Sequence, residues 1–166
     1  MDTIRADLMR EMEAYFKEDA KRINHAHRVT EHAEELLKWE RGDYLVVIGA
    51  SVLHDIGIHQ AQKKYGSTSS KYQEKEGPPI ARRILTRLGF EPNQIKEICD
   101  IIAHHHSPGK ITTKNFGILY DADWLVNLRG EYDIQDRNKL SNIIDKVFLT
   151  QSGKALARKI YLQEDK

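Results

Sequence analysis

His54 and Asp55 stand side by side, directly after the apolar run 44–53 and just before Gly57. An imidazole nitrogen and a carboxylate oxygen are both good ligands for a divalent transition metal. Neighbouring residues of a regular helix point about 100° apart, so one ion rarely binds both, but this restriction relaxes at a helix end. Gly57 predicts such an end. The doublet is therefore a candidate metal site.

Side chains of the same chemical types occur on other predicted helices or helix ends, and an all-α bundle can bring them to one interior point. They are His25, the triplet His104, His105 and His106, and either Asp121 or Asp123. Histidine nitrogens with carboxylate oxygens suit iron, manganese, nickel or zinc better than calcium. The sequence thus predicts a site for one or two divalent transition-metal ions.

The elements that must position these groups are predicted to be helices, because apolar residues recur at spacings of three and four. Such segments lie at about 2–20, 21–40, 78–88, 92–104, from 115 onward, around 143–148 and around 156–162. The valine-rich run 44–55 has strand propensity, but its neighbours are helical and no partner strand is visible, so we favour a helix. We predict an all-α bundle of about seven or eight helices, forming a single domain over residues 1–166.

Residues 57–76 are predicted to be a polar connection, with a helical turn at most around 60–64, and Pro78-Pro79 to open the next helix. A connection of ~20 residues is unusual in a compact domain and is often functional.

The composition argues for no particular macromolecular partner. The 26 basic and 25 acidic residues nearly cancel, which gives no whole-chain reason to expect nucleic-acid or membrane binding. The N-terminus lacks an apolar signal core, and no run approaches the ~18 apolar residues of a membrane span. With one cysteine, Cys99, no intrachain disulfide is possible. We expect a cytoplasmic protein and predict no particular oligomeric state.

Three short motifs follow one another along the chain: H-x-x-R-V at 25–29, L-H-D-I-G at 53–57 and A-D-x-L at 122–125. In this order they resemble the HD-domain superfamily of metal-dependent phosphohydrolases, over a motif span of residues 25–125. The resemblance implies metal ligands at His25, His54, Asp55 and Asp123. It favours Asp123 over Asp121, which lies two residues away and so points elsewhere on a helix.

Some members of this superfamily hold two metals through additional histidines before the last aspartate, which is where the histidine triplet lies. His105 shares a helical face with the neighbouring isoleucines and is predicted to point inward, with His104 the next candidate. Glu76 stands where two-metal relatives often have histidine. Two alternatives remain open: the triplet only caps a helix end, and Glu76 only favours the following helix N-terminus.

The resemblance implies hydrolysis of a small phosphoester, a nucleotide or nucleotide-like compound, by hydroxide formed at the metal. Asp55 would also help to position the water, and the connection 57–76 would serve as a lid or substrate loop. Two other functions are considered: a non-catalytic HD module that binds a nucleotide or a protein partner, and a di-iron oxygenase of the HD type. Cations that suit the phosphate, unless they are only solvated, are Arg28, Lys63, Lys64 and Lys71.

Overall fold

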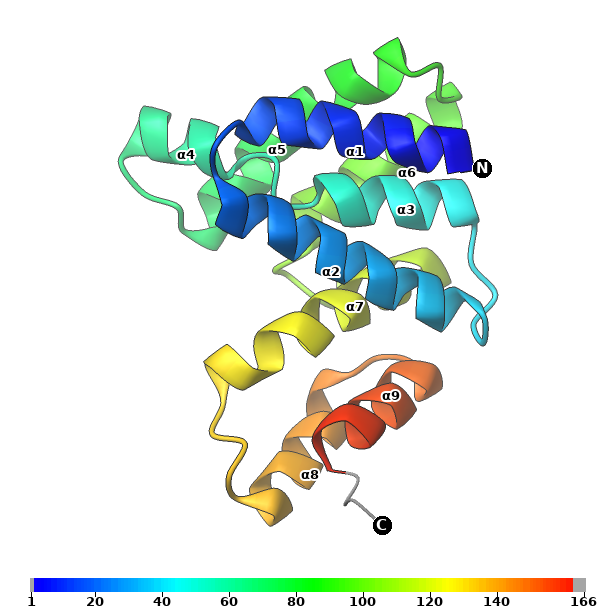
Figure 1. The fold of residues 1–166 in the computed structure, drawn as a ribbon, viewed down its shortest axis with the longest axis vertical. Coiled ribbons are helices and arrows are strands. Elements are labelled where there is room, and N and C mark those ends of the chain that lie inside the picture. The colour runs from blue at the N-terminus through cyan, green and yellow to red at the C-terminus, as the bar shows by residue number, and fades with distance from the viewer. Residues whose placement is uncertain (1, 163–166) are drawn as a thin grey trace.

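The computed structural model describes residues 2–162, and every regular element in that range is a helix, which confirms the all-α prediction (Figure 1). None of these helices is long and apolar enough to cross a membrane. In chain order they are α1 (Asp2–Phe16), α2 (Ala20–Leu37), α3 (Tyr44–Leu53), α4 (Ile58–Tyr65), α5 (Ser70–Arg87), α6 (Pro92–His104), α7 (Lys114–Glu131), α8 (Arg137–Val147) and α9 (Gln151–Tyr161).

Helix α3 is the centre of the bundle. Its residues 46–53 are all buried, and it packs against α1, α2, α5, α6 and α7. A helix that is apolar on every side must be surrounded by other elements, which is why this valine-rich run needs no partner strand. Asp43 caps it by accepting hydrogen bonds from the amides of Leu45 and Val46 at 3.1 and 3.3 Å. The prediction of a helix here is confirmed.

The segment 57–76 differs from the polar connection that the sequence predicts. It holds helix α4 and the first turns of α5, so that only residues 66–69 remain between the two helices. The prolines Pro78 and Pro79 lie inside α5 rather than at its start. The helix extends before them because tertiary contacts hold its first turns: Glu74 accepts hydrogen bonds from the His106 amide at 2.9 Å and from the Ser107 hydroxyl at 3.0 Å. The predicted lid is thus a helical hairpin.

Two glycines let this hairpin approach the His-Asp doublet. A Cβ atom on Gly57 would lie 2.5 Å from the amide nitrogen of Gly77 and 2.7 Å from the carbonyl oxygen of Gln73. Only glycine allows the backbone to come this close. The contact holds the turn after Asp55 against α5.

Helix α7 separates two parts of the molecule. It packs on α2 and α3 on one side and on α9 on the other, and α9 packs in turn on α8. Figure 1 shows the α8–α9 hairpin below α7, away from the first six helices. Residues two apart on α7 therefore face different surroundings.

Candidate metal centre

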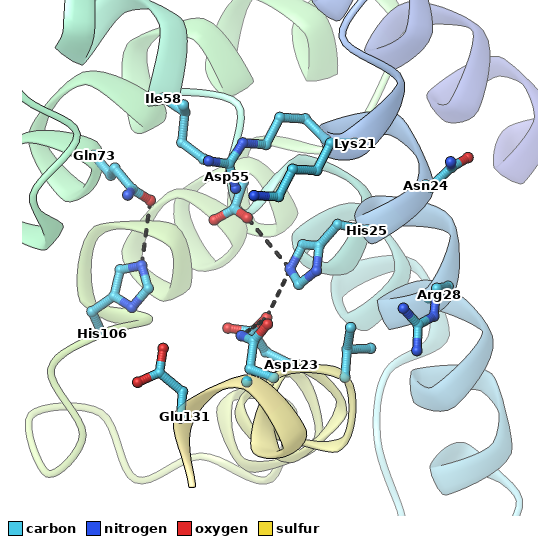
Figure 2. Close-up of a pocket in the computed structure, with 14 residues that line it drawn as sticks. Lys21, Asn24, His25, Arg28, Asp55, Ile58, Gln73, His106, Asp123 and Glu131 are labelled. Atoms are coloured by element: carbon cyan, nitrogen blue, oxygen red, sulfur yellow. Dashed lines mark hydrogen bonds and ion pairs between the residues drawn. The ribbon is translucent and has the colours of Figure 1, made fainter.

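The four residues that the resemblance implies as ligands lie together. His25 comes from the second turn of α2, His54 is the C-cap of α3, Asp55 follows it, and Asp123 comes from α7. His25 Nε2 lies 3.0 Å from Asp123 Oδ1, 3.2 Å from His54 Nε2 and 3.4 Å from Asp55 Oδ2. His54 Nε2 lies 3.3 Å from Asp55 Oδ2, which is possible because the helix has ended between them. Figure 2 shows His25, Asp55 and Asp123 turned toward one another.

A fifth side chain, His105, reaches the same carboxylate from α6's C-terminal end. Its Nε2 lies 3.3 Å from Asp55 Oδ1, and the side chain is buried. Asp55 therefore presents one oxygen to His25 and His54 and the other to His105. Two ligand groups result: His25, His54 and Asp55 form the first, and Asp55, His105 and His106 the second, with the ligand atoms of each within 4.8 Å of one another.

Hydrogen bonds fix the orientation of two rings in a way that fits a cation. The Nδ1 atoms of His54 and His105 donate to the carbonyl oxygens of Ser51 and Ile102, at 2.8 and 2.6 Å. In the neutral ring, Nε2 is then an acceptor, and in both residues it faces an oxygen of Asp55. Two acceptors this close repel each other unless a positive charge lies between them. His105 Nε2 is moreover buried without a hydrogen-bond partner, so the donor set fits a bound metal.

The pKa shifts of His54, Asp55 and Asp123 also indicate that this cluster favours positive charge. Burial lowers the pKa of His54, but the carboxylates of Asp55 and Asp123 raise it further, to well above the ordinary value. Burial raises the pKa values of Asp55 and Asp123, but His54 and the other histidines outweigh it and hold both low. A metal ion would compete with a proton for His54.

Asp123 rather than Asp121 faces the cluster. Asn127, one turn later on α7, donates from Nδ2 to Asp123 Oδ1 at 2.9 Å and so fixes the orientation of the carboxylate. Asp121 instead accepts hydrogen bonds from the amides of Leu149 and Thr150, both at 2.8 Å. It anchors the start of α9 and does not reach the histidines.

Several predicted site residues are not part of the cluster. Glu76 accepts a hydrogen bond from the Tyr65 hydroxyl at 2.9 Å and lies 3.5 Å from Lys64 Nζ, and neither ligand group includes it. His104 donates from Nδ1 to the carbonyl oxygen of Asp100 at 2.9 Å. His106, rather than the predicted His104, is the third member of the second ligand group. We predicted His104 as the next candidate after His105, but α6 ends at His104, so regular helical spacing does not determine where the following side chains point. Desolvation by the surrounding protein and the neighbouring His105 lower the pKa of His106, although the residue is exposed.

A cavity of about 580 Å³ opens beside the cluster (Figure 2). Lys63, Lys64 and Lys71 do not line it, because α4 and the start of α5 carry them away from the opening; Lys71 lies over the ring of Tyr72 instead. Arg28 does line it. The cavity's other lining residues include four that the sequence reasoning missed: Lys21, Arg22, Asn127 and Glu131. Helical spacing from the expected ligands could have found two of them, since Lys21 precedes His25 by four residues and Asn127 follows Asp123 by four.

A smaller cavity of about 280 Å³ shares part of this lining. The shared residues are His106, Asp123, Asn127 and Glu131. Its remaining walls include the aromatic rings of Tyr120 and Trp124. The cluster thus lies where a cavity with charged walls meets one with aromatic walls.

Comparison with known proteins places these residues in context. The family model described as HD domain matches residues 22–128, a stretch that contains all the clustered residues. The crystal structure of a protein described as a predicted HD superfamily hydrolase, from an uncultured Thermotogales bacterium, is similar to this fold with a TM-score of 0.70 and 25% sequence identity. The similarity covers 94% of this chain and 84% of that one. No match was found among the curated proteins.

Proposed function

The chain belongs to the HD-domain family of metal-dependent hydrolases, and from this premise we propose that it hydrolyses a small phosphoester, a nucleotide or nucleotide-like compound. One observation carries the proposal. Carboxylate oxygens of Asp55 and Asp123 each lie 3.0–3.4 Å from Nε2 of His25 and of His54, beside a cavity that also has cationic walls.

His25, His54, Asp55 and Asp123 would hold one divalent cation, of iron, manganese, nickel or zinc. When bound, such an ion supplies Lewis acidity, which lowers the pKa of water from ~16 toward ~7 and offsets phosphoryl charge. His105 and His106 would complete a second site through the other oxygen of Asp55, in place of the predicted Glu76 and His104.

The chain's own residues would position the reactants. Asp55, buried between the histidines, accepts a hydrogen bond from the attacking water and aligns it with phosphorus. Asn127 keeps the Asp123 carboxylate turned toward the histidines. Arg28, at the edge of the larger cavity, binds the phosphoryl oxygens as a charged donor.

The smaller cavity supports the nucleotide-like part of the proposal. The rings of Tyr120 and Trp124 offer flat apolar surfaces against which a base or another ring can stack. Ser70, Asn127 and Glu131 add groups that can bond hydroxyls or the edge of a base.

The test is metal content measured by mass spectrometry on anaerobically purified protein, together with turnover on a panel of phosphoesters. Wild type is compared with Asp55→Ala, and with Asp145→Ala as a control at an exposed position of α8. We expect about one or two metal equivalents and phosphate release in wild type and control, and neither in Asp55→Ala. Wild-type protein that holds no metal after reconstitution overturns the enzymatic proposal in favour of a binding module. Iron with oxygen-dependent turnover overturns it in favour of an oxygenase.

A further inference from the structure

The larger cavity is lined by charged side chains, and its net charge depends on whether a metal ion is bound. Asp55 and Asp123 belong to the ligand cluster, and Glu131 lies across the opening on α7 (Figure 2). The charged residues that line this cavity are the cations Lys21, Arg22 and Arg28 and the carboxylates of Asp55, Asp123 and Glu131. Three positive and three negative side chains cancel, so one divalent ion leaves the lining with two net positive charges, and a second ion leaves more.

The three cations are placed to meet a ligand beside the cluster. Lys21 and Arg28 lie four residues before and three residues after His25, so they flank it on one face of α2 (Figure 2). Among residues 2–162, no carboxylate forms an ion pair with the side chains of Lys21, Arg22 or Arg28. Elsewhere comparable cations are paired, as in the 2.9 Å contact of Arg5 with Glu34. Unpaired cations around a cavity attract anions.

We propose that the substrate is a phosphomonoester, with a dianionic phosphate group, and that Lys21, Arg22 and Arg28 select it over a phosphodiester. The inference rests on the proposed function. A monoester phosphate carries a charge of roughly −1.5 to −2 at pH 7, whereas a diester carries one negative charge. With one ion bound, the monoester therefore neutralises the cavity and the diester leaves positive charge uncompensated. With two ions bound, the monoester still compensates more of the charge than the diester does.

The kinetic test compares kcat/KM for p-nitrophenyl phosphate and bis(p-nitrophenyl) phosphate in manganese-loaded enzyme. The measured quantity is the monoester-to-diester ratio of each variant relative to wild type, in which the different intrinsic reactivities of the two esters cancel. Because a partly exposed charge pair contributes roughly a two- to five-fold factor, Lys21→Gln and Arg28→Gln should each lower the ratio by that amount. Substituting all three cations should lower it about tenfold or more.

Two further variants test the sign and the place of the effect. Glu131→Gln removes the opposing charge from the same cavity and should raise the ratio. Lys63→Gln removes an exposed cation outside the cavity and should leave it unchanged. Equal ratios in all variants, or an effect of Lys63→Gln as large as that of Lys21→Gln, overturn the inference.

A binding measurement separates failure of this inference from failure of the proposed function. Isothermal titration calorimetry at about pH 8, where the phosphonate is a dianion, compares phenylphosphonate with its monomethyl ester on manganese-loaded protein. We expect tighter binding of the dianion, and loss of that preference when the three cations are replaced. A preference without turnover of any ester sustains selection of the dianion by the three cations and overturns the proposed function. Turnover without a preference does the reverse, and absence of binding by either phosphonate also overturns the inference.

Discussion

Two aspartates of α7, Asp121 and Asp123, have the same side chain and nearly the same burial but serve different parts of the molecule. The Asp123 carboxylate lies 3.0 Å from His25 Nε2 and 3.4 Å from His54 Nε2, and it accepts a hydrogen bond from Asn127 Nδ2 at 2.9 Å. Asp121 faces the opposite side of the helix, where it meets Leu149 and Thr150 at the start of α9.

The difference lies in how completely the protein satisfies each carboxylate. Asp121 receives the two backbone amides and also the Thr150 hydroxyl at 2.7 Å, so its hydrogen-bonding capacity is used within the fold. Burial nevertheless raises its pKa to about 6. Asp123 faces ring nitrogens beside a cavity, and the histidines lower its pKa. A closed set of backbone donors makes a structural anchor, whereas a set of unsatisfied side-chain ligands makes a reactive site.

The largest effect that tests this contrast is expected from Asp123→Ala. The variant should lose at least about 10³-fold in hydrolysis, because it removes a ligand of an ion that contributes several kcal/mol. Its unfolding free energy without metal should fall by less than that of Asp121→Ala, because burial and repulsion from Asp55 offset much of the attraction between Asp123 and the histidines. Turnover, metal content and urea unfolding of chelator-treated protein measure the two effects. Lost stability with retained turnover would reverse the roles assigned to the two aspartates.

Asp121→Ala should show the opposite pattern. It leaves the amides of Leu149 and Thr150 and the Thr150 hydroxyl without their acceptor, and unfolding should become easier by about 3 kcal/mol. For a chain of this size, the midpoint of thermal unfolding would fall by roughly 6–12 °C. Activity per folded molecule should remain within a few-fold of wild type at low temperature. Asp121→Asn, which keeps one acceptor oxygen, should lose less; equal losses in the two variants would argue against the hydrogen-bond explanation.

Gly153→Ala tests the same anchor from the side of α9. A Cβ atom at this position would overlap the carboxylate of Asp121, so we expect a loss of about 2 kcal/mol from overpacking. Gly130→Ala on α7 is the matched control, because no atom lies within 4 Å of the added methyl group. It should leave stability unchanged or raise it by up to about 1 kcal/mol, as alanine favours a helix. Urea unfolding of both variants decides the point, and similar losses would exclude contact with Asp121 as the cause.

The smallest effect is expected at Glu40, a second link between α9 and the rest of the bundle. Its carboxylate accepts hydrogen bonds from Lys114 Nζ at 2.7 Å and from the Ser152 amide at 3.1 Å. Burial raises the pKa of Glu40, but Lys114 and Ser152 outweigh it and lower the pKa below the ordinary 4.5. The stabilisation is therefore present above pH 4.5 and is lost as pH falls through the folded-state pKa.

Glu40→Gln should thus be about 1 kcal/mol less stable than wild type at pH 7, and this difference should shrink as the pH falls through the lowered folded-state pKa of Glu40. Urea unfolding at several pH values measures it. The exposed Glu131→Gln is the control for the loss of one surface carboxylate, and its stability at pH 7 should match that of wild type. A constant difference for Glu40→Gln would mean that packing, rather than the charge, links α9 to the bundle.

Local patterns predicted much of this molecule. Apolar spacing located most of the helices, and the burial of α3 on all sides explains why its valines did not form a strand. The same reasoning failed in 57–76, where only Ile58 and Ala61 are buried in α4 and the signal was lost among polar neighbours. It also placed the start of α5 at the prolines, because the contacts of Glu74 with residues 106 and 107 are invisible in a local pattern.

By itself, the sequence determined the helical class and the order of the three motifs, because helix periodicity and ligand chemistry are properties of residue type and spacing. The tertiary structure alone decided which groups meet. It turned Asp121 toward α9, gave His106 rather than His104 to the second ligand group, and made Lys21 and Arg22 rather than the α4 lysines line the cavity. The physical reason is that direction depends on where each helix ends and on what packs against it, and both are set by contacts between residues far apart in the chain.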